Sequence, residues 1–134
     1  MALIMALESR FYRKKEAFKH IMITNTKGGA MEITNIETIP GKRITTHYGL
    51  VCGSTVRSKN AFKDIGASFK NMFGGELKNY TRLLEETRQE AISRMIEHAT
   101  SLGANAVVNV RFATSDVAAG AAEIYIYGTA VRVE

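Results

Sequence analysis

The pattern of apolar and polar positions predicts four strands. Residues 104–114 and 122–133 alternate with the period of two that a strand gives, and the small residues 115–121 form a loop between them. Residues 32–39 form a short strand with an imperfect phase. A Pro-Gly turn follows it, and residues 44–57, rich in Thr, Val, Ile and Tyr, form a long strand. We expect this long strand to pair back on the short one as a hairpin.

Apolar residues at intervals of three and four predict two helices in the middle of the chain. The first begins after Ser58, whose hydroxyl can cap the free amides of the first turn, and ends at the Gly74–Gly75 pair. The second runs from about residue 76 to residue 102 and is closed by Gly103. The order β-β-α-α-β-β predicts an α+β fold of two layers, a mostly antiparallel sheet with both helices on one face.

The last strand predicts that the chain associates with itself. Ile124 and Ile126 share one face of this strand, and Tyr125 and Tyr127 share the other, so both faces are apolar or aromatic. Two helices on one face of the sheet leave the second face uncovered in a monomer. Exposed apolar areas usually mark protein contacts, and symmetric self-association is the commonest way to cover them. We therefore predict an obligate homo-oligomer.

Composition and charge narrow the class of protein. The chain has 134 residues, of which 46% are hydrophobic and 23% charged, as in one domain of ordinary size. Of its formal net charge of +5, residues 1–30 hold six cations and two anions, whereas residues 31–134 hold twelve cations and eleven anions. A nearly neutral body lacks the basic surface that nucleic-acid binding requires. No apolar run approaches the roughly 18 residues of a membrane span.

Residues 1–30 form a basic N-terminal extension to a domain of residues 31–134. Apolar and basic residues of the extension fall on one helix face, at Leu7, Phe11, Lys14, Phe18 and Met22. This spacing predicts an amphipathic helix, which either packs on its own domain or binds a membrane surface or a partner groove. A further hypothesis is that Met31 is the native start and residues 1–30 a translated leader, because Lys27, Gly28 and Gly29 can be encoded by a purine-rich ribosome-binding stretch.

Cys52, the single cysteine, is the candidate metal ligand. One cysteine excludes an internal disulfide and indicates a reducing compartment, the cytoplasm. His47 lies five residues earlier and therefore on the opposite face of an unbroken strand. A bulge at Gly49 or Gly53 would shift the register and let the two side chains converge. The alternative is that Cys52 is an inert thiol in the core or in an interface.

Polar and aromatic residues of the last two strands form the candidate ligand surface. They are Asn105, Asn109, Arg111, Tyr125 and Tyr127. Alternate residues on neighbouring strands would form one surface, suited to a small anionic or planar ligand at a subunit interface. The alternative is that these side chains only hydrogen-bond across subunits. The sequence places no catalytic base beside a serine or threonine, so we predict that the protein is not an enzyme.

Several short motifs resemble the YbjQ-like family of small prokaryotic proteins. They are Ile33-Thr34 followed by Ile39-Pro40-Gly41, Gly49-Leu50-Val51 with Gly53, Gly103-Ala104-Asn105-Ala106-Val107-Val108, and Gly128-Thr129-Ala130-Val131. The resemblance covers residues 31–134. It implies a dodecin-like subunit in a ring-shaped homopentamer. Such proteins are often labelled heavy-metal-binding, yet these motifs contain no ligand set. A soft-metal site would need a ring of Cys52 thiols or His47 of a neighbouring subunit.

Two functions follow as expectations. The first is a cytosolic homo-oligomeric binding module that holds a small ligand or a metal ion between subunits, with the cofactor unassigned. The alternative is a scaffold whose ring assembly recruits a partner and which holds no ligand of its own. In both, the chain is its own partner, nucleic acid is not bound, and a membrane is bound only through residues 1–30.

Overall fold

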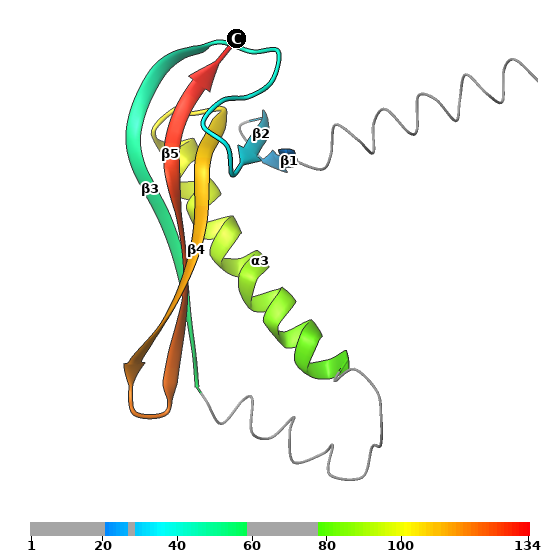
Figure 1. Ribbon diagram of the computed structural model, residues 1–134, viewed down its shortest axis with the longest axis vertical. Coiled ribbons are helices and arrows are strands. Elements are labelled where there is room, and N and C mark those ends of the chain that lie inside the picture. Colours follow the sequence, from blue (N-terminus) through cyan, green and yellow to red (C-terminus); the bar gives the residue numbers. More distant parts are fainter. Residues whose placement is uncertain (1–20, 27–28, 59–77) are drawn as a thin grey trace, which may run out of the picture.

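Five strands and one helix make up the described part of the chain. The computed structural model describes residues 21–26, 29–58 and 78–134. Their elements are β1 (Ile21–Thr26), β2 (Gly29–Thr34), β3 (Ile44–Ser58), α3 (Lys78–Ser101), β4 (Ala106–Ala118) and β5 (Ala121–Val133). Three long strands stand side by side with the helix on one face (Figure 1). The predicted α+β class is confirmed.

The strands form one mixed sheet in the order β1-β2-β4-β5-β3. The expected hairpin between the first two predicted strands is wrong, because β3 pairs antiparallel with β5 from Ile44↔Val133 to Ser58↔Ala121. Strand β2 instead pairs in parallel with β4, through Glu32↔Ala106 and Ile33↔Val107. The short β2 offers few partners to a strand of 15 residues, whereas β5 offers 13. The long-range pairing therefore replaces the local one.

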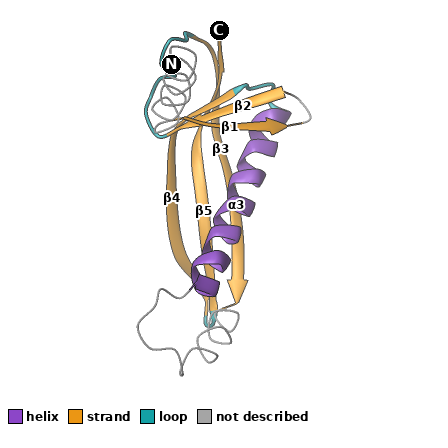
Figure 2. Ribbon diagram, turned by 90° about the vertical axis from the view of Figure 1, so that its right-hand side faces the viewer, coloured by secondary structure: helices purple, strands orange, loops and turns teal. Residues whose placement is uncertain are grey.

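Helix α3 confirms the second predicted helix within two residues at each end. It lies over β5 and β3 (Figure 2). The first predicted helix falls on residues 59–77, outside the described residues, and Ser58 is the last residue of β3. The helix predicted for residues 1–30 also falls largely outside them, although Met22 belongs to β1. Within the described ranges, no helix combines the length and apolarity that crossing a membrane requires.

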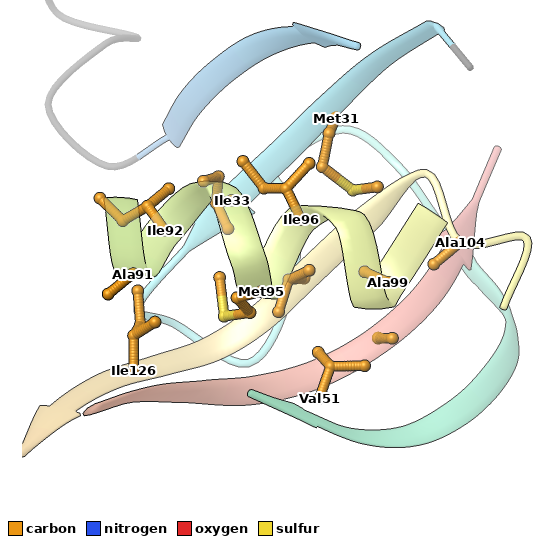
Figure 3. Packing of buried hydrophobic residues seen from close by; sticks show 12 residues of the cluster. Met31, Ile33, Val51, Ala91, Ile92, Met95, Ile96, Ala99, Ala104 and Ile126 are labelled. Carbon is orange, nitrogen blue, oxygen red and sulfur yellow. The ribbon is translucent and has the colours of Figure 1, made fainter. Parts of the chain in front are cut away.

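The main core lies between α3 and the sheet (Figure 3). It contains Met31, Ile33, Val51, Ala91, Ile92, Met95, Ile96, Ala99, Ala104, Val107, Ile126 and Ala130. The five helix residues recur at intervals of one, three and four, which confirms the predicted apolar stripe. Full burial of one large aliphatic side chain contributes about 1.5–3 kcal/mol. This core fixes the helix on its face of the sheet.

A second, smaller core lies on the opposite face of the sheet. It comprises Ile39, Ala106, Val108, Val131 and Val133, with Ile44 packed against them. Ile39, which is only 1% exposed, comes from the connection between β2 and β3. This connection crosses the face, so the expectation that the whole second face lies bare is wrong near the carboxyl end of β5.

A bulge in β4 changes which side chains share a face. Asn109 has φ of 55°, in the left-handed region that asparagine tolerates, and the register with β5 shifts between Val108 and Arg111. Val108 therefore packs in the second core, whereas Val110 packs against the main core. The expectation of unbroken alternation, with Val108 and Val110 on one face, is wrong for this reason.

The predicted loop of residues 115–121 is mostly strand. Strand β4 continues to Ala118 and β5 begins at Ala121, so that only Ala119 and Gly120 turn the chain. Gly120 has φ of 81°, which glycine adopts without the steric cost that a Cβ imposes. The two strands thus form a long ribbon beyond the end of the second core.

Candidate functional site

Among the described residues, no element covers the sheet face opposite α3 beyond the second core. Val51 and Ile126 point into the main core, so their neighbours in β3 and β5 point away from the helix. We call this surface the open face. Its residues are Leu50, Cys52, Ser54 and Val56 of β3, Tyr125 and Tyr127 of β5, and Arg111 and Ala113 of β4. Cross-strand pairing places Cys52 and Arg111 on either side of Tyr127.

Cys52 and two tyrosines form the centre of the open face. The rings of Tyr125 and Tyr127 lie 5.6 Å apart between centroids, tilted by 32°. Hydrogen bonding to Cys52, followed by burial and the charges of Cys52, Glu123 and Tyr127, raises the pKa of Tyr125 above its usual 10.0. At neutral pH this centre presents a phenol that keeps its proton beside a half-buried thiol.

The other predicted ligand residues bond to backbone groups of their own chain. The Asn105 amide donates to the carbonyl oxygen of Val133 at 2.9 Å and accepts from its N–H at 2.8 Å. The Arg111 Nη1 donates to the carbonyl oxygen of Asn35 at 2.6 Å. Asn109 forms the bulge of β4. The structure thus brings Arg111 beside the two tyrosines and places Asn105 at the carboxyl end of β5.

His47 and Cys52 lie on one face but far apart. The register with β5 shifts between His47 and Gly49, which agrees with the bulge predicted at Gly49 as one of two alternatives. The shift puts His47 opposite Val131, on the face of the second core. Cys52 lies opposite Tyr127. These two partners are four positions apart in β5, about 13 Å at 3.3 Å per residue. One chain therefore cannot bring both side chains to one metal ion.

The described residues of one chain do not fit a heavy-metal site. They contain no group of three or more His, Cys, Asp or Glu side chains that could hold a metal ion. The residue opposite Cys52 on β5 is Tyr127, whereas soft metals select several thiolate or imidazole ligands. Such a site would require Cys52 thiols from more than one copy, or Cys52 together with His47 of a neighbouring copy.

A row of helix side chains along the edge of β3 was not predicted. The Cys52 N–H donates to Nδ1 of His98 at 3.4 Å, and the Arg94 Nη1 donates to the carbonyl oxygen of Ser54 at 2.5 Å. Arg94 also pairs with Glu90 at 2.6 Å. The spacing of four that joins Glu90, Arg94 and His98 is the sequence signal for such a row. His98 and Arg94 thus bond backbone groups of Cys52 and Ser54 at the edge of the sheet that β3 forms.

A solved structure from a bacterium has the same fold. It is the crystal structure of a protein with unknown function from Pediococcus pentosaceus, which is described as belonging to the DUF74 family. The TM-score is 0.53 at 17% identity, and the match covers 78% of this chain and 98% of that chain. At this identity the likeness shows the fold alone.

Relatives in bacteria and archaea match about three quarters of this chain. A UPF0145 protein of Hahella chejuensis is 65% identical over 104 residues, which cover 78% of this chain and 100% of the relative. UPF0145 proteins of Clostridium perfringens and Archaeoglobus fulgidus are 57% and 54% identical, covering 78% and 75% of this chain and 98% and 94% of theirs. The model of the YbjQ family, described as "Putative heavy-metal-binding", matches residues 31–134. The chain belongs to this family.

Proposed function

We propose that the protein is a cytoplasmic homo-oligomeric binding module that holds a small planar or anionic ligand on the open face, between subunits. The observation that supports this proposal is the group of Cys52, Tyr125 and Tyr127, which no element of the described chain covers.

Exposed apolar side chains on the open face favour self-association. Leu50 is 66% exposed and Val56 51% exposed, and both flank Cys52 along β3. Covering such side chains contributes up to about 1.5–3 kcal/mol each when burial is complete. A second copy of the chain covers them by symmetry without any other protein. We propose five subunits, the number that the resemblance to the family implies.

The chemistry of the same surface favours a planar or anionic ligand over a metal ion. Two tyrosine rings offer flat apolar surfaces with hydroxyl groups at their ends. Arg111, opposite Tyr127, supplies a positive charge. A metal ion would need the thiols of several copies to meet at one point.

Catalysis forms no part of this proposal. A general base works best when its pKa lies near the operating pH. The phenol of Tyr125 has its pKa raised away from that range, so it is a poor base for activating the neighbouring thiol.

Native mass spectrometry and elemental analysis of the purified protein test the proposal. We expect an oligomer that carries a small organic molecule, and Tyr127→Leu should release it. Ser93→Ala, on the exposed side of α3, is the control and should retain it. An oligomer with stoichiometric metal that Cys52→Ser releases would contradict the ligand class. An oligomer with no bound molecule would support the scaffold function instead.

A further inference from the structure

The connection between β2 and β3 is tied to β4 at its start. We call this connection, residues 35–43, the strap. The Asn109 N–H donates to the carbonyl oxygen of Ile36 at 2.9 Å. The Arg111 Nη1 donates to the carbonyl oxygen of Asn35 at 2.6 Å. Two hydrogen bonds thus join the first two residues of the strap to the bulge of β4.

The middle and the end of the strap are anchored as well. Ile39 is only 1% exposed and packs in the second core. Arg43 exchanges two backbone hydrogen bonds with Glu134, at 2.8 and 3.0 Å. A strap that is anchored at its start, middle and end can hold in place a side chain that bonds to it.

The bulge in β4 turns Arg111 onto the open face. In an unbroken strand Arg111 would share the face of Val107, which packs in the main core. The register shift between Val108 and Arg111 instead puts Arg111 opposite Tyr127. The bulge therefore brings the strap and the tyrosines to the same arginine.

Arg111 is held so that one edge of its guanidinium can take an anion. Within the described ranges, its hydrogen bonds both leave from Nη1, to the carbonyl oxygens of Asn35 and Val110 at 2.6 and 2.9 Å. Arginine binds a carboxylate, sulfonate or phosphate through two parallel N–H donors, and Nε and Nη2 form such a pair. Because Nη1 already fixes the guanidinium, binding an anion costs less ordering of this side chain.

Charge along the open face gives a ligand a direction. Glu123, Tyr125 and Tyr127 alternate along β5 and therefore share the open face. Glu123 lies at the hairpin end of this row, opposite Ser115, whereas Arg111 lies opposite Tyr127. A planar ligand that stacks on the tyrosines should therefore place its anionic group at Arg111 and away from Glu123.

We propose that Arg111 binds the anionic group of the ligand and that the strap positions Arg111 for this role, so that seating of the strap and binding of a planar anion strengthen each other. The inference rests on the ligand site of the proposed function. Such coupling is reciprocal: if the seated strap favours the anion, the bound anion must favour the seated strap. Hydrogen exchange of the Asn109 amide, which donates to the strap, reports this seating.

Two probes with the same ring system test the proposal, naphthalene-2-sulfonate as the planar anion and naphthalene-2-methanol as its neutral counterpart. Calorimetric titration gives their affinities for the native chain, Arg111→Gln and Ile39→Ala. The matched control, Ile92→Ala, makes the same deletion in the main core, on the other face of the sheet. Tyr127→Leu should weaken both probes and so places them on the open face. Nuclear magnetic resonance measures the exchange of the Asn109 amide.

We expect the native chain and Ile92→Ala to bind the sulfonate about tenfold more tightly than the alcohol, because only the sulfonate pairs with Arg111. Arg111→Gln and Ile39→Ala should lose most of this preference and keep their affinity for the alcohol. The sulfonate, unlike the alcohol, should slow exchange of the Asn109 amide about threefold or more in the native chain. If Ile39→Ala does not fold, judged by circular dichroism, this exchange decides alone.

Two results would contradict the proposal in different ways. An unchanged preference for the sulfonate in Arg111→Gln or Ile39→Ala, or Asn109 exchange that the sulfonate does not slow, would overturn the role of the strap and leave the ligand site intact. Absence of probe binding, or binding that Tyr127→Leu does not weaken, would overturn both this proposal and the ligand site.

Discussion

Gly53 of β3 lies directly against the backbone of α3. A Cβ there would overlap the carbonyl oxygen of Ala91 and lie 2.5 Å from the amide nitrogen of Met95. These are backbone atoms, which cannot move aside as a flexible side chain does. Gly53→Ala should therefore lower the free energy of unfolding by about 1–3 kcal/mol, the usual cost of overpacking, in chemical denaturation.

Ser54→Ala is the matched control for Gly53→Ala. Ser54 is the next residue of β3 and belongs to the open face, so its loss should change the free energy of unfolding by less than about 0.5 kcal/mol. Equal denaturation midpoints for the two variants would contradict the packing of α3 on β3 at Gly53.

Cys52 governs the titration of Tyr125. The hydrogen bond between them is the largest cause of the raised pKa, so Cys52→Ala should lower the pKa of Tyr125 toward 10.0. As pH rises above 10.0, native Tyr125 keeps its proton while the unfolded tyrosine loses it, and the free energy of unfolding falls. That fall should be smaller in Cys52→Ala. An ultraviolet titration, with Tyr125→Phe to assign the signal, measures the shift, and an unchanged titration in Cys52→Ala would contradict the contact.

At the scale of residues, the sequence predicts which side chains share a strand face better than it predicts which side chains touch across strands. The pairing of Tyr125 with Tyr127 on one face of β5 follows from a period of two, and the structure confirms it. The bond between Cys52 and Tyr125 depends on the register between β3 and β5. No local pattern encodes that register, because it is set by pairing across more than seventy residues.

Among the elements, the junction of β4 and β5 depends on Asn105. Its side chain replaces a strand partner by bonding both backbone groups of Val133. Asn105→Ala leaves these groups without that partner and should cost about 1–3 kcal/mol of unfolding free energy. Asn35→Ala, an exposed position, is the control and should cost less than about 0.5 kcal/mol. If Asn105→Ala released a bound ligand without loss of stability, the residue would belong to the binding site instead.

Helix α3 and the ends of β3 and β5 could be predicted because their signals are local. Apolar intervals and a closing glycine mark the helix, and alternation marks the strands. The order of strands in the sheet could not be predicted, because β2 and β4 pair in parallel although about seventy residues separate them in the sequence. The bulge at Asn109 also escaped prediction, because asparagine enters the left-handed region only where the surrounding pairing requires it.

At the scale of the whole molecule, β5 is apolar or aromatic on both faces, which predicts that both faces of the sheet are covered. In the structure, the face opposite α3 has two halves. The connection that carries Ile39 covers one half. The half around Cys52 and Tyr127 lies open in the described chain. Hydrophobic pattern alone does not distinguish a face covered by a loop of its own chain from a face left for a partner.

Sedimentation equilibrium at micromolar concentration tests self-association through the open face most directly. Leu50→Lys with Val56→Lys places two charges on this face and leaves both cores intact. The control, Arg82→Lys with Arg88→Lys, changes only exposed positions of α3. We predict an oligomer for the native chain and the control, and folded single chains for the Leu50→Lys, Val56→Lys variant. A native chain that sediments as a folded single subunit would contradict the account.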